Sequence, residues 1–341
     1  MRWDDLAGME TQRGQLVAAV QSNRMGHAHI LTGPAGSGKK LFATMVARSF
    51  LCEREASDKL SSCGECPSCK QVEAGTHPDC QTWVKPEEDK EFKIDFMRQL
   101  IESSQLKAAG GRGKVFIIEP ADAFNEESSN CFLKTLEEPP HGMWIALLCE
   151  NSENLLPTIR SRCQTLRFTP LPAIQIERIL EANGVTDQVS RKEIARLSEG
   201  IPGLAMTLSN PAQRKFWQEC GSLVLSYPFS GTDWSDMIKG SIEEITGGPA
   251  QRAHVRSILK LHMGMWADLH RLVHGLEPRT QPESLVERME KCAGRLDQRK
   301  IASVAEATMI ADDRLKWGAL VSLAIEAMGD SLEDQFRPAQ T

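Results

Sequence analysis

The sequence lacks a surplus of basic residues, and it lacks long apolar runs. The chain has 40 Lys and Arg against 46 Asp and Glu, a net charge of −6, whereas a dedicated nucleic-acid binder usually carries a basic excess. No stretch of apolar residues reaches the length of a membrane span, and Met1 to Leu6 form no apolar signal region. Repeats and low-complexity tracts are also absent. These absences disfavour a free-standing DNA-binding protein, a membrane protein and a secreted protein.

The composition that is present is typical of a globular chain. With 341 residues, of which 41% are hydrophobic and 25% charged, the length suggests two or three domains. Ten cysteines in such a chain predict a reducing cytoplasm, where clustered thiols bind metal and isolated thiols stay free. We interpret the isolated cysteines as small buried apolar residues. They include Cys131, Cys149, Cys163, Cys220 and Cys292.

The first half of the chain alternates between strand and helix signals. Lys114–Glu119 and Trp144–Cys149 are apolar runs of the kind found in strands buried on both faces. Strands separated by helices imply a parallel sheet with right-handed crossovers. The predicted strands are 29–32, 80–84, 114–119, 144–149 and 165–168, and the predicted helices are 10–22, 39–51, 94–108 and 126–138.

After Thr169-Pro-Leu-Pro172 the predicted elements are all helical. Gly and Pro clusters at 200–203, 210–211, 247–249 and 278 separate them. The predicted helices are 174–183, 191–198, 204–208, 212–225, 250–274, 283–296 and 300–328. We therefore expect an α/β domain over 1–168, a small helical domain over 169–209, an all-α domain over 210–335 and a frayed tail over 336–341.

A glycine-rich run follows the first predicted strand and opens the next helix. In Gly33-Pro-Ala-Gly-Ser-Gly-Lys-Lys40, backbone N–H groups around Gly36 and Gly38 would wrap a phosphate, with Lys39 as the point charge. A working phosphate loop then needs Ser or Thr, whose hydroxyl binds magnesium, and Lys40 stands there instead. The alternative is a loop of this shape that no longer binds nucleotide productively. ATP binding is therefore doubtful, and hydrolysis is not expected.

A second defect lies at the end of the strand Lys114–Glu119. A working ATPase of this kind ends that strand with two adjacent acids, one for magnesium and one for the attacking water. Here the pair is Glu119-Pro120, and proline supplies no acid. Two independent substitutions, at positions 40 and 120, both remove groups that ATP hydrolysis needs, and this favours a catalytically inactive site.

Four cysteines form the most specific local signal. Cys52, Cys63, Cys66 and Cys69 follow a C-x10-C-x2-C-x2-C pattern just behind the glycine loop. Four thiolates at such spacing predict a tetrahedral zinc site, and four protein ligands leave no open position. We therefore predict a structural Zn²⁺ module over residues 52–69, in which nearby His77 is not needed as a ligand. The alternative is four free surface thiols.

Other candidate reactive groups are weak. His270 and His274 lie one helical turn apart, but no Glu follows the first as an H-E-x-x-H zinc site requires. Packing or surface histidines are the simpler interpretation. No local Ser-His-Asp or Cys-His motif is present.

Taken in order, the motifs resemble those of subunits of bacterial DNA polymerase III clamp loaders, a family of the AAA+ class. The resemblance covers residues 1–210 well, and the remainder matches the family's collar domain only by position and length. It implies an AAA+-type P-loop domain, a helical lid and an oligomerisation collar. The motifs are Arg24–His29, Thr32–Lys39, the four cysteines, Leu133–Pro140 and Leu156–Cys163.

Within this family the chain resembles the non-hydrolysing stator type more than the ATPase motor, tau/gamma. Lys40 and Pro120 are consistent with a degraded nucleotide site, and Gly203 stands where the motor has a nucleotide-sensing arginine. The resemblance implies a hetero-oligomer with the motor and delta subunits that helps load the sliding clamp onto primed DNA. It also implies a role in trans for Arg162, as an arginine finger in a neighbour's ATP site. The alternative for Arg162 is an ion pair with a carboxylate of its own chain.

Two rival functions are weighed against this one. An active ATPase subunit would carry Ser or Thr at position 40 and an acid at position 120, and both are missing. A zinc-dependent nucleic-acid-binding module would need a basic, aromatic-rich surface around the cysteines. The cysteine loop is instead largely acidic, with Glu53, Glu55, Asp58 and Glu65.

Overall fold

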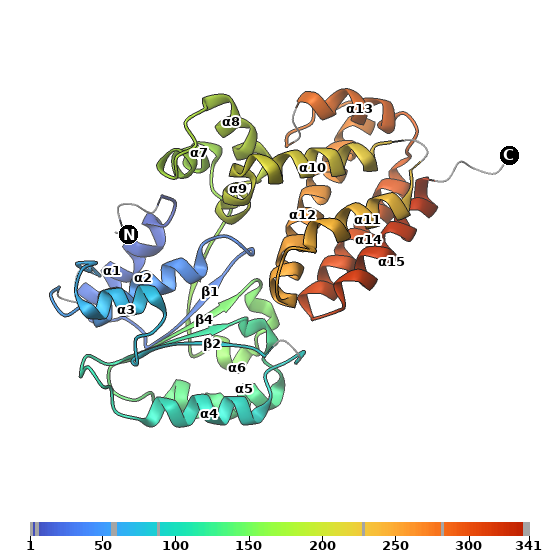
Figure 1. Cartoon of the computed structure of the whole chain (residues 1–341). Helices are drawn as coiled ribbons and strands as arrows, with labels where there is room; N and C mark the ends of the chain where they lie inside the picture. Colours follow the sequence, from blue (N-terminus) through green and yellow to red (C-terminus); the bar gives the residue numbers. More distant parts are fainter. Residues whose placement is uncertain are drawn as a thin grey trace. The chain divides into compact units, whose positions relative to one another are not determined.

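The computed structural model describes residue 3 and residues 7–55, 60–86, 89–226, 229–280 and 283–336. The chain forms two compact units, Met1–Leu171 and Pro172–Thr341 (Figure 1). The predicted boundaries at 168 and 209 and the separate lid and collar domains stay predictions. Two predicted segments lie partly outside the described residues. They are the zinc module, at residues 56–59 (which include Asp58), and the tail, at residues 337–341.

The first unit is built on a parallel sheet of five strands in the order β2-β3-β4-β1-β5. The predicted α/β class with a parallel sheet is confirmed. The β4 strand is buried along its whole length, because it lies between two neighbours and under helices on each face. The strands are β1 (Ala28–Thr32), β2 (Cys80–Val84), β3 (Lys114–Glu119), β4 (Met143–Cys149) and β5 (Gln164–Arg167).

Helices cover both faces of this sheet (Figure 1). One face carries α1 (Glu10–Gln21), α2 (Lys39–Leu51) and α3 (Pro67–Ala74), and the other carries α4 (Ile94–Gln105), α5 (Glu126–Glu137) and the short α6 (Pro157–Arg160). The core under α2 is apolar and closely packed. It includes Leu31, Phe42, Val46, Val115 and Ala146.

Parallel pairing places the functional loops at one edge of the sheet. Thr32, the last residue of β1, is in register with Cys149 at the end of β4, and Ile118 of β3 is in register with Leu147. The loops that follow β1, β3 and β4 therefore meet at the carboxyl ends of the strands, where ligands of open α/β sheets bind.

The second unit is all helical, as expected, but its helices differ from the prediction in two places. The predicted helix 300–328 is two helices, because Gly318 adopts φ +88° and turns the chain between α14 and α15. The α11 helix was not predicted, although Ser230 caps it by accepting a hydrogen bond from the Asp233 N–H (3.1 Å).

None of the helices in the described ranges is both long enough and apolar enough to cross a membrane. The helices are α7 (Ala173–Ala182), α8 (Gln188–Leu197), α9 (Pro202–Ser209), α10 (Pro211–Val224), α11 (Gly231–Ile242), α12 (Gly248–Val273), α13 (Glu283–Ala293), α14 (Gln298–Lys316) and α15 (Val321–Phe336).

The core of this unit contains a buried histidine, His262, between two tryptophans. Its ring centroid lies 5.7 Å from that of Trp234 and 6.4 Å from that of Trp266. Its Nε2 atom lies 3.5 Å from the Sγ atom of Cys220. Burial lowers the pKa of His262 from 6.5 to about 4, so the folded unit holds the ring neutral.

This lowered pKa predicts that stability falls on acidification. In the unfolded chain His262 takes up a proton near pH 6.5, whereas the folded chain resists until about pH 4. The neutral His262 ring makes its full contribution to the free energy of unfolding above pH 6.5. This contribution is lost as the pH falls toward 4, with about 2 kcal/mol lost between pH 7 and pH 5. We expect His262→Gln to lose this part of the pH dependence, measured by urea unfolding at both pH values. An unchanged difference between the two pH values would reject the assignment.

Candidate functional site

The glycine loop leads from β1 into α2, and the side chain of its lysine is turned onto the loop itself. Gly38 precedes α2 and Lys39 is the first residue of that helix. The Nζ atom of Lys39 donates to the carbonyl oxygens of Gly33 (2.6 Å) and Pro34 (2.8 Å). Burial lowers the pKa of Lys39, and nearby carboxylates oppose that shift. The charge expected to meet a phosphate therefore satisfies its own loop in this conformation.

Lys40 occupies the position that would otherwise hold the magnesium-binding hydroxyl. Its Nζ atom lies 3.0 Å from Oε2 of Glu119, the acid at the end of β3. The ammonium group of Lys40 is thus paired with Glu119, the acid at the end of β3 that a working site would use for magnesium. Pro120 follows Glu119, so the second acid of a working site is missing.

Asp122, which sequence reasoning missed, stands near this position but is committed to structure. Its buried carboxylate accepts hydrogen bonds from the N–H groups of Glu150 (2.7 Å) and Asn151 (3.2 Å), and from Nδ2 of Asn154 (3.2 Å). These contacts fix the loop after β4. Asp122 therefore cannot be assigned the role of the missing second acid without losing them.

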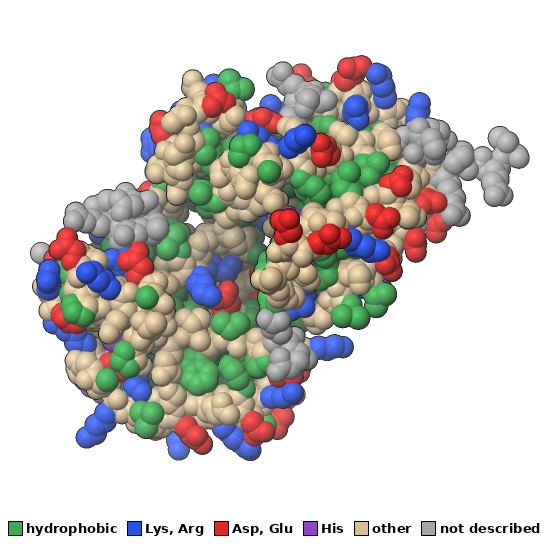
Figure 2. Space-filling model, in the orientation of Figure 1, with side chains coloured by type: hydrophobic (Ala, Val, Ile, Leu, Met, Phe, Trp, Pro, Cys, Tyr) green, Lys and Arg blue, Asp and Glu red, His purple; other side chains and the backbone are tan. Residues whose placement is uncertain are grey.

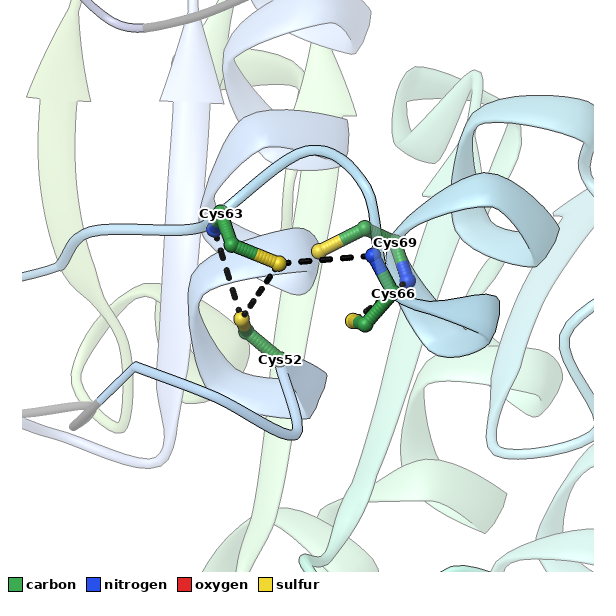
Figure 3. A group of neighbouring side chains, drawn as sticks. All are labelled: Cys52, Cys63, Cys66 and Cys69. Carbon is green, nitrogen blue, oxygen red and sulfur yellow. Dashed lines mark hydrogen bonds between the residues drawn. The ribbon is translucent and has the colours of Figure 1, made fainter.

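The structure brings the four predicted cysteines together at the end of α2 (Figure 3). Their Sγ atoms all lie within 4.8 Å of one another, and those of Cys52 and Cys63 are 3.7 Å apart. Tetrahedral zinc with Zn–S bonds of about 2.3 Å requires S···S separations of roughly 3.8 Å. All four side chains are free thiols. The arrangement fits a metal ion held by four sulfurs.

Backbone N–H groups are directed at three of these sulfurs. Cys52 Sγ accepts from the N–H of Cys63, Cys63 Sγ from that of Cys66, and Cys66 Sγ from that of Cys69, each at 3.4 Å. Backbone N–H groups of Glu65 and Cys66 lower the pKa of Cys63 to about 6. Gly64, at φ +74°, makes the turn between the second and third cysteines. The backbone N–H groups therefore favour the thiolate of Cys63, whereas burial raises the pKa of Cys69 to about 12.

Neighbouring side chains hold the cysteine module against the sheet domain. Arg112 donates from Nη1 to the carbonyl oxygen of Cys52 and from Nη2 to that of Glu53 (2.8 Å). Ser68 Oγ donates to the carbonyl oxygen of Leu51 (2.7 Å) and lies 2.8 Å from Nε2 of His77. The other ring nitrogen of His77 accepts from the Asp79 N–H (3.0 Å). Both ring nitrogens of His77 are thus used in holding the module against the sheet domain.

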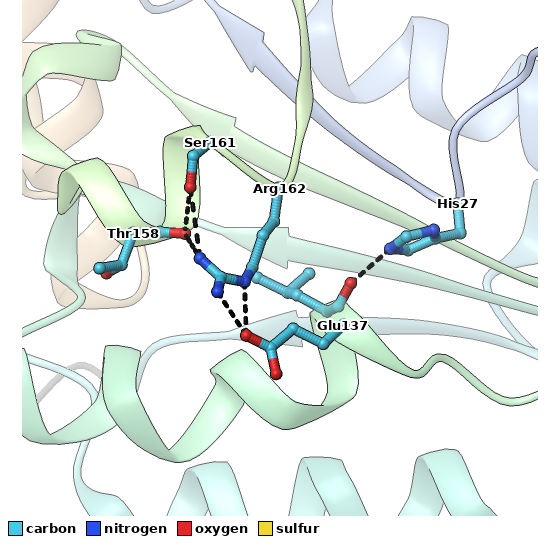
Figure 4. Close-up of polar contacts among 6 residues, drawn as sticks. His27, Glu137, Thr158, Ser161 and Arg162 are labelled. Atoms are coloured by element: carbon cyan, nitrogen blue, oxygen red, sulfur yellow. Dashed lines mark hydrogen bonds and ion pairs between the residues drawn. The ribbon is translucent and has the colours of Figure 1, made fainter.

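Arg162, just after α6, is bound within its own chain (Figure 4). Its Nε atom donates to Oε1 of Glu137 (2.8 Å), and its Nη2 atom donates to the same oxygen. Its Nη1 atom donates to the carbonyl oxygen of Thr158 (2.9 Å) and to Oγ of Ser161 (3.3 Å). The ion pair with a carboxylate, which the sequence left open as an alternative, is thus present in the isolated chain.

This cluster joins three of the segments that the sequence singled out. Nε2 of His27 hydrogen-bonds to the carbonyl oxygen of Leu136 (2.6 Å), the residue before Glu137 (Figure 4). The segments 24–29, 133–140 and 156–163 therefore meet in one place, although they are more than 100 residues apart at the extremes. Sequence reasoning found the segments but not these contacts.

A five-stranded parallel sheet of this order, with a glycine loop after β1, defines a P-loop protein of the AAA+ type. Residues 8–172 match the family model described as "DNA polymerase III, delta subunit". DNA polymerase III subunit delta' of Escherichia coli is 32% identical over 241 residues, which cover 70% of each chain. The chain belongs to the family of DNA polymerase III delta-prime subunits, and the resemblance drawn from the motifs is confirmed.

Two further relatives show the extent of the similarity. The delta-prime subunit of Pseudomonas aeruginosa is 36% identical over 191 residues, which cover 55% of this chain and 57% of that protein. The Escherichia coli tau subunit is 29% identical over 61% of this chain and 32% of its own length. The chain thus spans little more than half of the length of the Pseudomonas relative.

Proposed function

We propose that this chain is the non-hydrolysing stator subunit of a clamp loader, which helps to load a sliding clamp onto primed DNA. The observation that carries the proposal is the Lys40–Glu119 ion pair, which puts an ammonium where an ATPase needs magnesium. Membership of the delta-prime family gives the context for that lesion. Partners would be the motor (tau/gamma) and delta subunits, with the clamp and primed DNA reached through the complex.

We infer that Cys52, Cys63, Cys66 and Cys69 hold one structural Zn²⁺ ion. Four sulfurs would fill its coordination, so the ion would stabilise the loop between α2 and α3 without reacting. The charges near the cluster do not favour a nucleic-acid-binding role for it. Glu53, Glu55 and Glu65 are acidic, and Arg54 lies 3.6 Å from a Glu65 oxygen. In Figure 2, blue and red side chains are interspersed on the visible face without one continuous basic area.

The glycine loop is proposed as a degenerate phosphate site formed by Gly33, Gly36, Gly38 and Lys39. Three carboxylates, those of Glu150, Asp122 and Glu119, lie close enough to Lys39 to influence its pKa. Their field opposes the binding of a polyphosphate unless magnesium screens it, and Lys40 stands in place of the magnesium-binding residue. Nucleotide turnover at this loop is therefore not part of the proposed function.

We expect no ATP hydrolysis by the isolated chain, and none by its Lys40→Thr variant. The variant restores the hydroxyl for magnesium, but Pro120 still leaves the attacking water without its acid. Phosphate release over time, with Lys39→Ala as the control, measures this. Turnover in the unmodified protein that Lys39→Ala abolishes would contradict the proposal.

Reconstitution with the motor and delta subunits tests the function directly. We expect the full chain to co-elute with them as one complex and to be required for loading a labelled clamp onto primed DNA. A complex that forms and loads clamps equally well without this chain would refute the stator role. In that complex we propose that Arg162 acts as an arginine finger on nucleotide bound by a neighbouring motor subunit.

A further inference from the structure

The hydrogen-bonding capacity of Arg162 is almost fully used inside the chain. A guanidinium group has five N–H donors. Four hydrogen bonds involve them here, two to Glu137 and one each to Thr158 and Ser161. One donor therefore remains. A bidentate grip on a phosphate needs two parallel N–H groups, so Arg162 must release an internal partner before it can bind one in this way.

The three partners of Arg162 are not equivalent. Thr158 and Ser161 belong to the same short segment as Arg162 and would travel with it. Glu137 instead ends α5, a separate helix, and holds the guanidinium to that helix. The Arg162 and Glu137 side chains are 33% and 49% exposed, and a pair this exposed stabilises by no more than about 1 kcal/mol. Glu137 is thus the partner that both restrains Arg162 and yields at little cost.

The backbone next to Glu137 is fixed, so only its side chain is free to move. The carbonyl oxygen of Leu136 is bonded to His27, and the Leu136 side chain is buried. At the other end of the contact, Ser161 Oγ donates to the Thr158 carbonyl oxygen (3.0 Å) and orders the turn that carries Arg162. The ion pair therefore joins two rigid points through two side chains that can swing apart.

We infer that Glu137 is a positioning residue that keeps Arg162 turned inward until a more highly charged acceptor displaces it. Given the proposed function, on which this inference rests, the acceptor is the terminal phosphate of a nucleoside triphosphate bound by an adjacent subunit. A terminal phosphate with its several charged oxygens attracts a guanidinium more strongly than one half-exposed carboxylate does. In the free chain the charged Arg162 then stays paired with Glu137. It turns outward to act as a finger only where nucleotide is present.

The chain supplies a matched control in the next residue. Glu138 is exposed and adjacent to Glu137 in sequence, whereas the hydrogen bonds of Arg162 go to Glu137, Thr158 and Ser161. Glu137→Gln and Glu138→Gln remove the same charge and keep almost the same shape. A difference between them therefore reports the contact with Arg162 and not the general loss of an acid.

The first arm of the test uses the isolated chain. Phenylglyoxal modifies accessible arginines, and mass spectrometry follows the adduct on Arg162 with the other arginines as internal references. We expect Glu137→Gln to speed modification of Arg162 about two- to fivefold, the range that an exposed ion pair can supply, and Glu138→Gln to leave it unchanged. Equal rates in all three proteins would overturn the inference, whatever Arg162 does in a complex.

The second arm measures the DNA- and clamp-stimulated ATPase rate of the reconstituted complex. We expect Glu137→Gln to raise the rate by up to about fivefold, because a larger fraction of Arg162 is ready to engage. The double variant Glu137→Gln/Arg162→Ala should match Arg162→Ala. If Arg162→Ala lowers the rate but Glu137→Gln leaves it unchanged or lowers it, the restraint is wrong and the finger stands. If Arg162→Ala has no effect, the proposed finger role of Arg162 is rejected. The phenylglyoxal experiment then still tests whether Glu137 restrains Arg162.

Discussion

Replacing Arg162 with alanine is expected to lower the DNA- and clamp-stimulated ATPase rate of the assembled complex, although the proposed site of hydrolysis lies in another chain. An arginine finger contributes about 10³- to 10⁵-fold to phosphoryl transfer at the site that it serves. That site should become nearly silent, and the total rate should fall to what the remaining sites supply. Arg162→Lys should not restore it, because an ammonium lacks the planar fork of donors.

The fold and the assembly are expected to survive this change. The Arg162–Glu137 pair is exposed, so its loss costs at most about 1 kcal/mol. Size-exclusion chromatography of the mixed subunits and thermal unfolding of the free chain check both points. A full ATPase rate in the variant complex would reject the role in trans. A complex that no longer forms would mean that Arg162 is structural.

Replacing Cys66 with serine is expected to release the metal and unfold the loop around it. Binding of a structural zinc ion contributes about 10–16 kcal/mol in small zinc modules, and this binding is coupled to folding of the ligand loop. Metal analysis should give one zinc per chain for the unmodified protein and much less for Cys66→Ser. Hydrogen exchange should then speed up in α3 and at the end of α2, while β4 stays protected.

A cysteine outside the cluster provides the control for this experiment. Cys131 lies in α5 of the same unit and is half-buried and free. Cys131→Ser should keep the zinc content and the exchange pattern of the unmodified protein. A purified chain that is folded and metal-free, with all four cluster thiols reacting freely, would rule out the metal site.

The central elements could be predicted because local sequence determines them. The bounds of β2, β3 and α2 agree with the prediction, since turn-forming residues flank each apolar or amphipathic run. The α3 and α6 helices, of 8 and 4 residues, were missed because each begins at a proline inside a segment assigned to a motif. The break at Gly318 was missed because apolar residues continue on both sides of it. A single glycine does not reveal whether the chain turns there.

In the candidate site, too, the features encoded within short segments were predicted, and the contacts between distant segments were not. The glycine loop and the four cysteines are encoded by spacing within short segments, and the structure brings the four cysteines together. The Arg162–Glu137 pair joins residues 25 positions apart, and the His27–Leu136 contact joins residues 109 apart. Such contacts depend on how α5, α6 and the approach to β1 pack. No periodicity in the sequence specifies that packing.

The ion pair of Lys40 with Glu119 has a consequence for how this subunit would respond to its surroundings. A magnesium ion comes and goes with nucleotide, whereas an ammonium that belongs to the chain is always present. We therefore expect the loop to keep one geometry whether the cell is rich or poor in ATP, and whether magnesium is abundant or chelated. In the proposed clamp loader, whose motor subunits would change shape with each turnover, such a subunit would keep a constant shape.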